Sequence, residues 1–379
     1  MNVQLQPKPN AMELLSEDNA ALLEAATEIA TRDLAPLVQD IDLKGIYPEA
    51  ILRSLGAAGA YASHAPMSEV GTFDLESSIR AMSVVGEQCL STAFCMWCQD
   101  ALAWYIATSD NAALKAELGP KVTAGKFLGG TALSNPMKTL FGIEKLKLKG
   151  KRVEGGFEVS GALPWVSNLG EDHYFGAIFS LPDENDRMVM AVIDCANENV
   201  RLVQNAEFTA LDGTRTFGLQ LRNAFIPDSR VLADPIVSYI PRIRAGFILL
   251  QSGMAFGLIR SCIELMEQSG RSLSHVNCYL PDQPTDFRAQ LEAMEAEVYE
   301  LAKTPFDLSK EYFVRVIKAR LAAGDASVAA AHNAMLHCGA RGYVKQGAAQ
   351  RKLREAYFVA IVTPATKQLR KMLADFGAA

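Results

Sequence analysis

Histidine, cysteine and serine most often carry metal binding or nucleophilic catalysis, and here their spacing suits neither. The two closest histidines in this 379-residue chain, His332 and His337, are five apart, a poor pair on one helical face. The chain contains no Gly-x-Ser-x-Gly, no His-Glu-x-x-His and no phosphate-binding loop. A hydrolase or a metalloenzyme therefore has little support, and we predict no bound metal. The other histidines, interpreted as structural, are His64, His173 and His275.

Two short segments carry hydroxyl and aromatic side chains that could bind a flat ligand. The segments are GGTALSNP (129–136) and PWVSN (164–168). Ser134 and Ser167 offer hydroxyls that donate and accept hydrogen bonds, and Trp165 offers a ring face or edge. A tryptophan on a strand is more often simple core, and serines near turns are common. Taken alone, these residues therefore do not predict a ligand site, and the prediction depends on the motifs around them.

The cysteines indicate the cellular compartment of the protein, and the overall charge indicates which classes of partner it can bind. Cys95 and Cys98 form a Cys-x-x-Cys in an apolar stretch with no preceding strand, which favours buried structural thiols over a metal or redox site. An odd total of seven cysteines fits a reducing cytoplasm. The net charge of −6 argues against nucleic acid. The N-terminal ten residues lack a signal-peptide pattern, and the apolar runs are too short to span a membrane, so we expect no membrane partner.

The elements that must position these residues fall into three zones. Residues 12–126 repeat apolar side chains at three- and four-residue spacing, which predicts helices. From residue 127 to 234 short alternating runs such as HYFGAIFSL and RMVMAVIDC predict strands. The helical period returns over 235–379. The expected domains are therefore helical (1–126), β (127–234) and helical again (235–379). This order does not suggest a dinucleotide-binding fold, which needs alternating strands and helices.

Four segments in this order resemble signatures of the acyl-CoA dehydrogenase superfamily, and the resemblance covers nearly the whole chain. Residues 133–136 (LSNP) stand where the family has Leu-Thr-Glu-Pro. Residues 165–168 (WVSN) resemble a Trp, a branched residue, Thr or Ser, and Asn that follow a glycine. The segment 211–232 resembles the strand and turn that close the β domain. The segment HCGARGYV (337–344) looks like a degraded Gly-Gly-x-Gly-Tyr turn.

The resemblance implies an α+β fold with an N-terminal helical domain, a β-barrel-like middle domain and a C-terminal four-helix bundle. It also implies FAD between the last two. An isoalloxazine ring needs a flat apolar wall and a few hydrogen-bond donors, which Trp165, Ser134 and Ser167 can supply. The residues that the resemblance assigns to the cofactor are Leu133, Ser134, Trp165, Ser167, Arg271, Gly339, Thr366 and Gln368.

Arg271 and the 337–344 turn carry the prediction of a homo-oligomer, either a dimer or a tetramer. Arg271 lies near the place where the family has an arginine that reaches the FAD pyrophosphate of a neighbouring subunit. A guanidinium suits this role because it pairs with two phosphate oxygens at once. The family's following Phe-Gly is absent, so a solvated arginine at a helix end is an equal alternative.

The carboxylate that family dehydrogenases use to remove the substrate's α proton is missing. Counting nine residues from Arg354 places Thr363 at the base position, and the alternative register places Pro364 there. A second family position falls on or beside Phe247, in a run without Asp or Glu. Glu355 is nearby in sequence but is expected to face solvent. The substrate-facing loop is altered too, since MKTLFG follows Pro136 in place of Gly-Ala-Gly-Ser-Asp.

Without this base the dehydrogenase reaction loses a contribution of roughly 10²–10⁴-fold. One branch of the superfamily instead reacts reduced flavin with O2 and oxygenates an aromatic or heteroatom substrate. An oxygenase acting on a CoA thioester, as the tropone-forming flavoproteins of bacterial secondary metabolism do, reconciles the missing base with the acyl-CoA-like motifs. A flavin reductase is then a potential partner. Two alternatives stay open: an acyl-CoA or acyl-carrier-protein dehydrogenase with a relocated base, and a non-catalytic relative.

Overall fold

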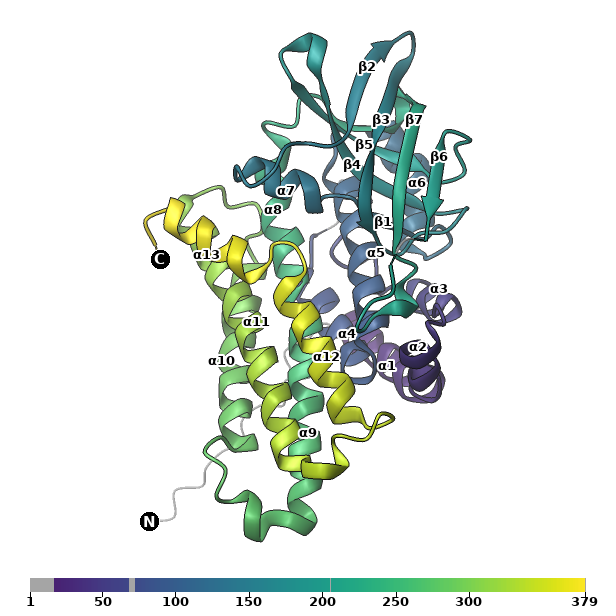
Figure 1. The fold of residues 1–379 in the computed structure, drawn as a ribbon. Helices are drawn as coiled ribbons and strands as arrows, with labels where there is room; N and C mark the ends of the chain where they lie inside the picture. The colour runs from purple at the N-terminus through teal and green to yellow at the C-terminus, as the bar shows by residue number, and fades with distance from the viewer. Residues whose placement is uncertain (1–16, 68–71, 205, 379) are drawn as a thin grey trace.

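The computed structural model describes residues 17–67, 72–204 and 206–378. It has three parts in chain order: N-terminal helices, a mixed sheet, and a C-terminal group of long helices (Figure 1). The beginning of the predicted first helical region, residues 12–16, lies outside the described residues. The α+β class and the helical, β, helical architecture predicted from the sequence are confirmed.

The N-terminal part is built around one fully buried helix. All 19 residues of α5 (Leu90–Thr108) are buried, which fits an apolar composition on every side. The side chain of Asp74 caps the neighbouring α4 by accepting from the Ser77 amide, and Asn111 caps α6 in the same way through the Leu114 amide. The helices of this part are α1 (Glu17–Glu28), the π-helical turn η2 (Ile29–Leu34), α2 (Val38–Lys44), α3 (Glu49–Ala57), α4 (Leu75–Gln88), α5 and α6 (Ala112–Thr123).

The middle part is an eight-stranded mixed sheet with the order β6-β7-β3-β2-β4-β5-β8, and β1 pairs with β4. The pairings β1–β4 and β2–β4 are parallel and the others are antiparallel. A separate apolar core of buried strand residues, including Phe157 and Phe179, stabilises it. The strands are β1 (Gly129–Thr131), β2 (Lys149–Val153), β3 (Gly156–Val166), β4 (Tyr174–Leu181), β5 (Arg187–Asp194), β6 (Val200–Val203), β7 (Phe217–Pro227) and β8 (Val231–Ala233).

A short helix, α7 (Ser134–Leu140), stands where the sequence suggested only a strand start and a substrate-facing loop. Pro136 lies in its first turn, where a missing amide hydrogen costs no helical hydrogen bond. The buried Asn135 side chain accepts from the Lys147 amide and donates to the Lys145 carbonyl, both at 2.9 Å. These bonds tie α7 to the segment that enters β2. In Figure 1, α7 lies at the boundary between the sheet and the C-terminal helices.

The C-terminal part is a bundle of α9, α10, α11 and α12, flanked by α8 and α13 (Figure 1). One helical stretch, Tyr239–Asn277, is long and apolar enough to cross a membrane, but 89% of its apolar window is buried inside the protein. It therefore serves as a core helix of the fold. The helices are α8 (Tyr239–Leu250), α9 (Ser252–Asn277), α10 (Pro284–Ala302), α11 (Lys310–Cys338), α12 (Ala348–Ile361) and α13 (Thr366–Asp375).

Candidate functional site

The two short segments singled out in the sequence lie side by side. The Asn168 side chain donates to the Gly129 carbonyl at 2.6 Å, which joins the end of β3 to β1. A side chain at Gly130 would place its Cβ 2.2 Å from the Ser167 carbonyl, so only glycine permits this approach. The segments 129–136 and 164–168 therefore form one surface.

The C-terminal segment completes this surface from the helical side. The hydroxyls of Ser134, at the start of α7, and Thr363, between α12 and α13, lie 2.9 Å apart. The buried side chain of Gln368 donates to the Met137 carbonyl at 3.2 Å. The hydroxyl of Thr366 donates to the Ala360 carbonyl at 3.0 Å, within its own turn. Ser134 of α7 thus meets Thr363 and Gln368, which lie more than 200 residues later in the chain, at one junction.

Trp165 projects outward from β3 and is not part of a core. Its side chain is 58% exposed and contacts Phe208 edge to face, with ring centroids 6.1 Å apart. Beside it, the hydroxyl of Ser167 lies 2.6 Å from that of Thr216, a residue that the sequence did not single out. Leu133 is buried behind Ser134. The junction therefore presents an open aromatic ring and two pairs of partly buried hydroxyls.

Neither expected base position holds a proton acceptor. The described partners of Thr363 are the Ser134 hydroxyl and the Gln251 side chain, whose Nε2 donates to the Thr363 carbonyl at 2.8 Å. Over the part of the chain that the structure describes, no carboxylate bonds to Thr363 or Ser134. The alternative position, Pro364, is buried. A threonine hydroxyl without a neighbouring base cannot take up a carbon-bound proton.

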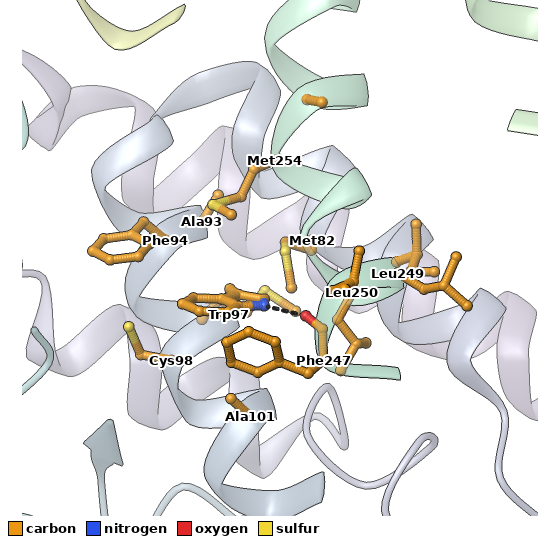
Figure 2. Packing of buried hydrophobic residues seen from close by; sticks show 14 of the residues in the cluster. Met82, Ala93, Phe94, Trp97, Cys98, Ala101, Phe247, Leu249, Leu250 and Met254 are labelled. Carbon is orange, nitrogen blue, oxygen red and sulfur yellow. Dashed lines mark hydrogen bonds between the residues drawn. The ribbon is translucent and has the colours of Figure 1, made fainter. Parts of the chain in front are cut away.

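Phe247, at the second expected position, is buried in an aromatic cluster (Figure 2). The indole Nε1 of Trp97 donates to the Phe247 carbonyl at 3.3 Å, and the two rings are 5.0 Å apart. Phe94 stacks on Trp97, and its ring lies 4.5 Å from that of Phe358 on α12. The contact between α5, α8 and α12 is therefore buried and aromatic at this position.

Two buried carboxyl groups lie elsewhere, and one corrects an expectation. The prediction that Glu355 faces solvent is wrong, because its side chain is 2% exposed and lies 3.3 Å from the Lys352 ammonium. Asp100 is fully buried, with both carboxyl oxygens lacking a hydrogen-bond partner among the described residues, and burial raises its pKa well above the ordinary value. His64 lies nearby, with Nε2 2.9 Å from the Asp100 carbonyl, and burial lowers its pKa to about 4.

Arg271 and Gly339 lie together at the distal end of the bundle, away from the junction. The Ser269 hydroxyl donates to the His337 carbonyl at 2.5 Å, which joins α9 to the turn that contains Gly339. Both Arg271 and Gly339 are exposed, and the structure shows no hydrogen bond or ion pair of Arg271 with any described residue. These two residues can reach a ligand at the junction only from another copy of the chain.

Other candidate sites are weaker. The Cys-x-x-Cys thiols of Cys95 and Cys98 are buried inside α5, as predicted, and burial raises both pKa values. Within the described ranges, no group of three or more His, Cys, Asp or Glu side chains could hold a metal ion. A hollow of about 640 Å³ near β8 is lined by charged groups that already pair with one another. Its pairs are Arg152 with Asp228, Arg187 with Glu184 and Asp234, and Arg242 with Asp110.

Comparison with known proteins agrees with this architecture. Residues 16–126 match the family model of the acyl-CoA dehydrogenase N-terminal domain. The human mitochondrial short-chain specific acyl-CoA dehydrogenase is 22% identical over 379 aligned residues, covering 95% of this chain and 90% of the relative. The butyryl-CoA dehydrogenase of Megasphaera elsdenii superposes with a TM-score of 0.83 at 16% identity, over 96% of this chain and 98% of the other.

An oxygen-using enzyme has the same fold. The dibenzothiophene monooxygenase TdsC of Paenibacillus sp. A11-2 superposes with a TM-score of 0.79 at 16% identity, over 92% of this chain and 95% of the other. A further structure of that monooxygenase holds FMN. The fold is therefore shared by dehydrogenases and by an oxygenase. Residues 16–126 match the N-terminal domain of the acyl-CoA dehydrogenases, and the whole chain is similar in sequence and in fold to members of that superfamily.

Proposed function

We propose that this protein is an FAD-dependent oxidoreductase that uses O2 to oxygenate a CoA thioester or an aromatic substrate. The flavin would lie where β3, α7 and the link between α12 and α13 meet. The observation that carries the oxygenase preference is the Ser134–Thr363 hydroxyl pair at the position of the family base. The aromatic cluster around Phe247 at the alternative position supports it, because neither place can accept an α proton.

The residues at the junction fit a flavin. The ring of Trp165 is exposed and can serve as the apolar wall against which the flat flavin ring packs. Ser134, Thr363, Ser167 and Thr216 are partly buried hydroxyls, and each can turn to donate or accept. Such groups match a ring edge that carries both carbonyls and nitrogens. The donor set is uncharged, so it imposes no fixed protonation state on the ligand.

In this proposal the chain's own residues bind, orient and exclude water. A bound flavin supplies hydride acceptance in its oxidised form and reactivity toward O2 in its reduced form. Trp165 and the hydroxyl pairs fix the ring. Phe94, Trp97 and Phe247 keep the neighbouring space dry, which slows unproductive reaction with water. Thr363 donates or accepts one hydrogen bond and moves no proton.

The alternative function is a thioester dehydrogenase with a relocated base, and Asp100 is the side chain that favours it. A buried carboxyl with a raised pKa can act as a general base near neutral pH. Asp100 lies on α5, the helix that also carries Trp97 of the aromatic cluster. Its enclosed position beside His64 argues for a structural role. The two functions differ in whether an acyl-CoA reduces the flavin without oxygen.

Anaerobic mixing of the FAD-loaded protein with short-, medium- and aryl-acyl-CoAs tests the proposal. We expect the oxidised flavin band to persist, and chemically reduced enzyme to give product labelled from ¹⁸O2. Rapid bleaching by a saturated acyl-CoA that is lost in Asp100→Asn would establish the alternative. We further propose a cytoplasmic homo-oligomer that receives electrons from a flavin reductase. The compartment rests on the seven free cysteines and the oligomer on the exposed Arg271. The reductase follows only from the proposed oxygenase reaction, which requires reduced flavin.

A further inference from the structure

Arg320 is a buried cation whose hydrogen bonds run to neutral groups. It lies within α11 and is 2% exposed. Its Nε donates to Oε1 of Gln251 at 2.7 Å, and its Nη2 donates to the carbonyl of Val359 in the last turn of α12. The negative end of the α12 dipole favours a cation at that place. Burial lowers the pKa of Arg320 only to about 10, so the guanidinium is charged at neutral pH.

Gln251 transmits the position of this guanidinium to the junction. It is fully buried at the boundary between α8 and α9. Because an arginine can only donate, the carbonyl oxygen of the Gln251 amide must face Arg320. The amide nitrogen therefore faces the opposite way, where it donates to the Thr363 carbonyl at 2.8 Å. A charged donor on one side thus fixes the direction of a neutral donor on the other.

Thr363 is held at both of its polar ends. Its carbonyl accepts from Gln251 and its hydroxyl pairs with Ser134 at 2.9 Å. Arg320 meanwhile holds the end of α12 through Val359, four residues before Thr363. Two buried side chains therefore fix both the last turn of α12 and the turn that follows it. Ser134 and Thr363, which form the hydroxyl pair, are both partly exposed and so remain open to the predicted flavin.

We propose that Arg320 and Gln251 are positioning residues that hold Thr363 against Ser134 and thereby set the hydroxyl pair that faces the flavin. The inference rests on the proposed function for its flavin readout, while the position of the turn can be measured without a flavin. In this arrangement the buried guanidinium of Arg320, the side-chain amide of Gln251 and the Thr363 carbonyl fix the site through contacts on the side away from the flavin.

The variant Gln251→Glu separates positioning from folding. A glutamate keeps an acceptor for Arg320 and forms a buried ion pair, but it cannot donate to the Thr363 carbonyl. The matched control is Tyr239→Phe, at the start of α8, which removes another buried donor to a backbone carbonyl: the Tyr239 hydroxyl donates to Tyr105 at 2.6 Å. The readouts are amide hydrogen exchange of the peptide covering 359–369, the absorption of bound FAD, and the rate of oxygenated product formation.

We expect exchange in 359–369 to rise about five- to tenfold in Gln251→Glu and to stay at the wild-type rate in Tyr239→Phe. With FAD bound, the flavin band shifts and the product rate falls about tenfold at unchanged flavin content. Unchanged exchange in Gln251→Glu would overturn the positioning role. A wild-type protein that takes up no FAD would refute the proposed function, while the exchange rates would still decide the role of Gln251.

Discussion

The carboxylate of Glu355 lies 3.3 Å from the ammonium of Lys352, and both side chains are buried where α12 meets α4. The ammonium also donates to the Gly86 carbonyl at 3.1 Å. The same carboxyl oxygen, Oε2, makes no hydrogen bond with any described residue, so the contact with Lys352 is an ion pair only. Such a pair stabilises a fold only while both members are present, because a single buried charge is costly.

Lys352→Met should therefore lower the free energy of unfolding by about 3–5 kcal/mol, since it leaves the Glu355 carboxylate buried and unpaired. Urea unfolding of the two proteins at the same pH measures this loss. The double variant Lys352→Met with Glu355→Leu should recover most of it, because no charge is then buried. A double variant as unstable as the single one would mean that packing, and not charge, dominates here.

Thr363→Glu should install trace dehydrogenase activity, because it places a carboxylate where family enzymes have their base. General-base catalysis contributes roughly 10²–10⁴-fold, so even a poorly oriented carboxylate should bleach the flavin measurably faster with an acyl-CoA under anaerobic conditions. Thr363→Gln has the same size without the charge and is the control. If Thr363→Glu fails, Pro364→Glu tests the other register. Equal bleaching by the glutamate and glutamine variants would contradict the assignment of this position.

Trp165→Ala should weaken FAD binding about tenfold, because an exposed aromatic wall is removed. The side chain is 58% exposed, so the free energy of unfolding should change little. The flavin-to-protein ratio after gel filtration, together with a urea titration, separates these effects. Cys95→Ala is the control: it should leave the flavin content unchanged at a modest packing cost of about 1 kcal/mol. Full FAD retention in Trp165→Ala would exclude this residue from the site.

His64 and Asp100 should titrate with opposite signs. The pKa of His64 is lowered by burial from 6.5 to about 4, so unfolding takes up a proton and stability is lost as the pH falls through this range. The pKa of Asp100 is raised by burial, so unfolding releases a proton above about 3.8 and stability is lost as the pH rises. Between pH 4 and 6.5 the two effects therefore oppose each other in the wild type.

Single variants should reveal how each residue alone changes the free energy of unfolding with pH. Asp100→Asn leaves only the histidine, so the free energy of unfolding should rise by up to about 3 kcal/mol between pH 4 and 6.5. His64→Gln leaves only the carboxyl, so the same quantity should fall over that range. Urea titrations at four pH values compare the variants with the wild type. Parallel curves for all three proteins would show that the pair does not change its protonation on unfolding.

Much of the fold follows from the sequence, because periodicity reports burial directly. The alternating runs of 174–181 and 187–194 became β4 and β5, and the long apolar repeats of the C-terminal part became the bundle. The helix α7 escaped detection because seven residues with an internal proline give no helical period. The burial of Glu355 depends on which face of α12 packs against α4. This packing is set by tertiary contacts, which the pattern of a single helix in the sequence does not reveal.

Residues of the candidate site could be predicted from the sequence only where they belong to a motif. The proximity of 129–136 and 164–168 followed from the resemblance, and so did the absence of a base at Thr363. Gln251, Arg320 and Thr216 were missed, since each acts through contacts between elements far apart in the chain. One signal was available for Arg320: an arginine in an apolar stretch of helix with no acidic residue three or four positions away.

The complete burial of α5 has a consequence for how this protein can change. A helix with a solvent face offers positions where substitutions are nearly neutral, but all 19 residues of α5 contact other parts of the protein. Saturation mutagenesis should therefore find α5 intolerant along its whole length, without the three- to four-residue rhythm seen for surface helices. New substrate preferences would have to arise from its neighbours, or from paired replacements that conserve volume across a contact.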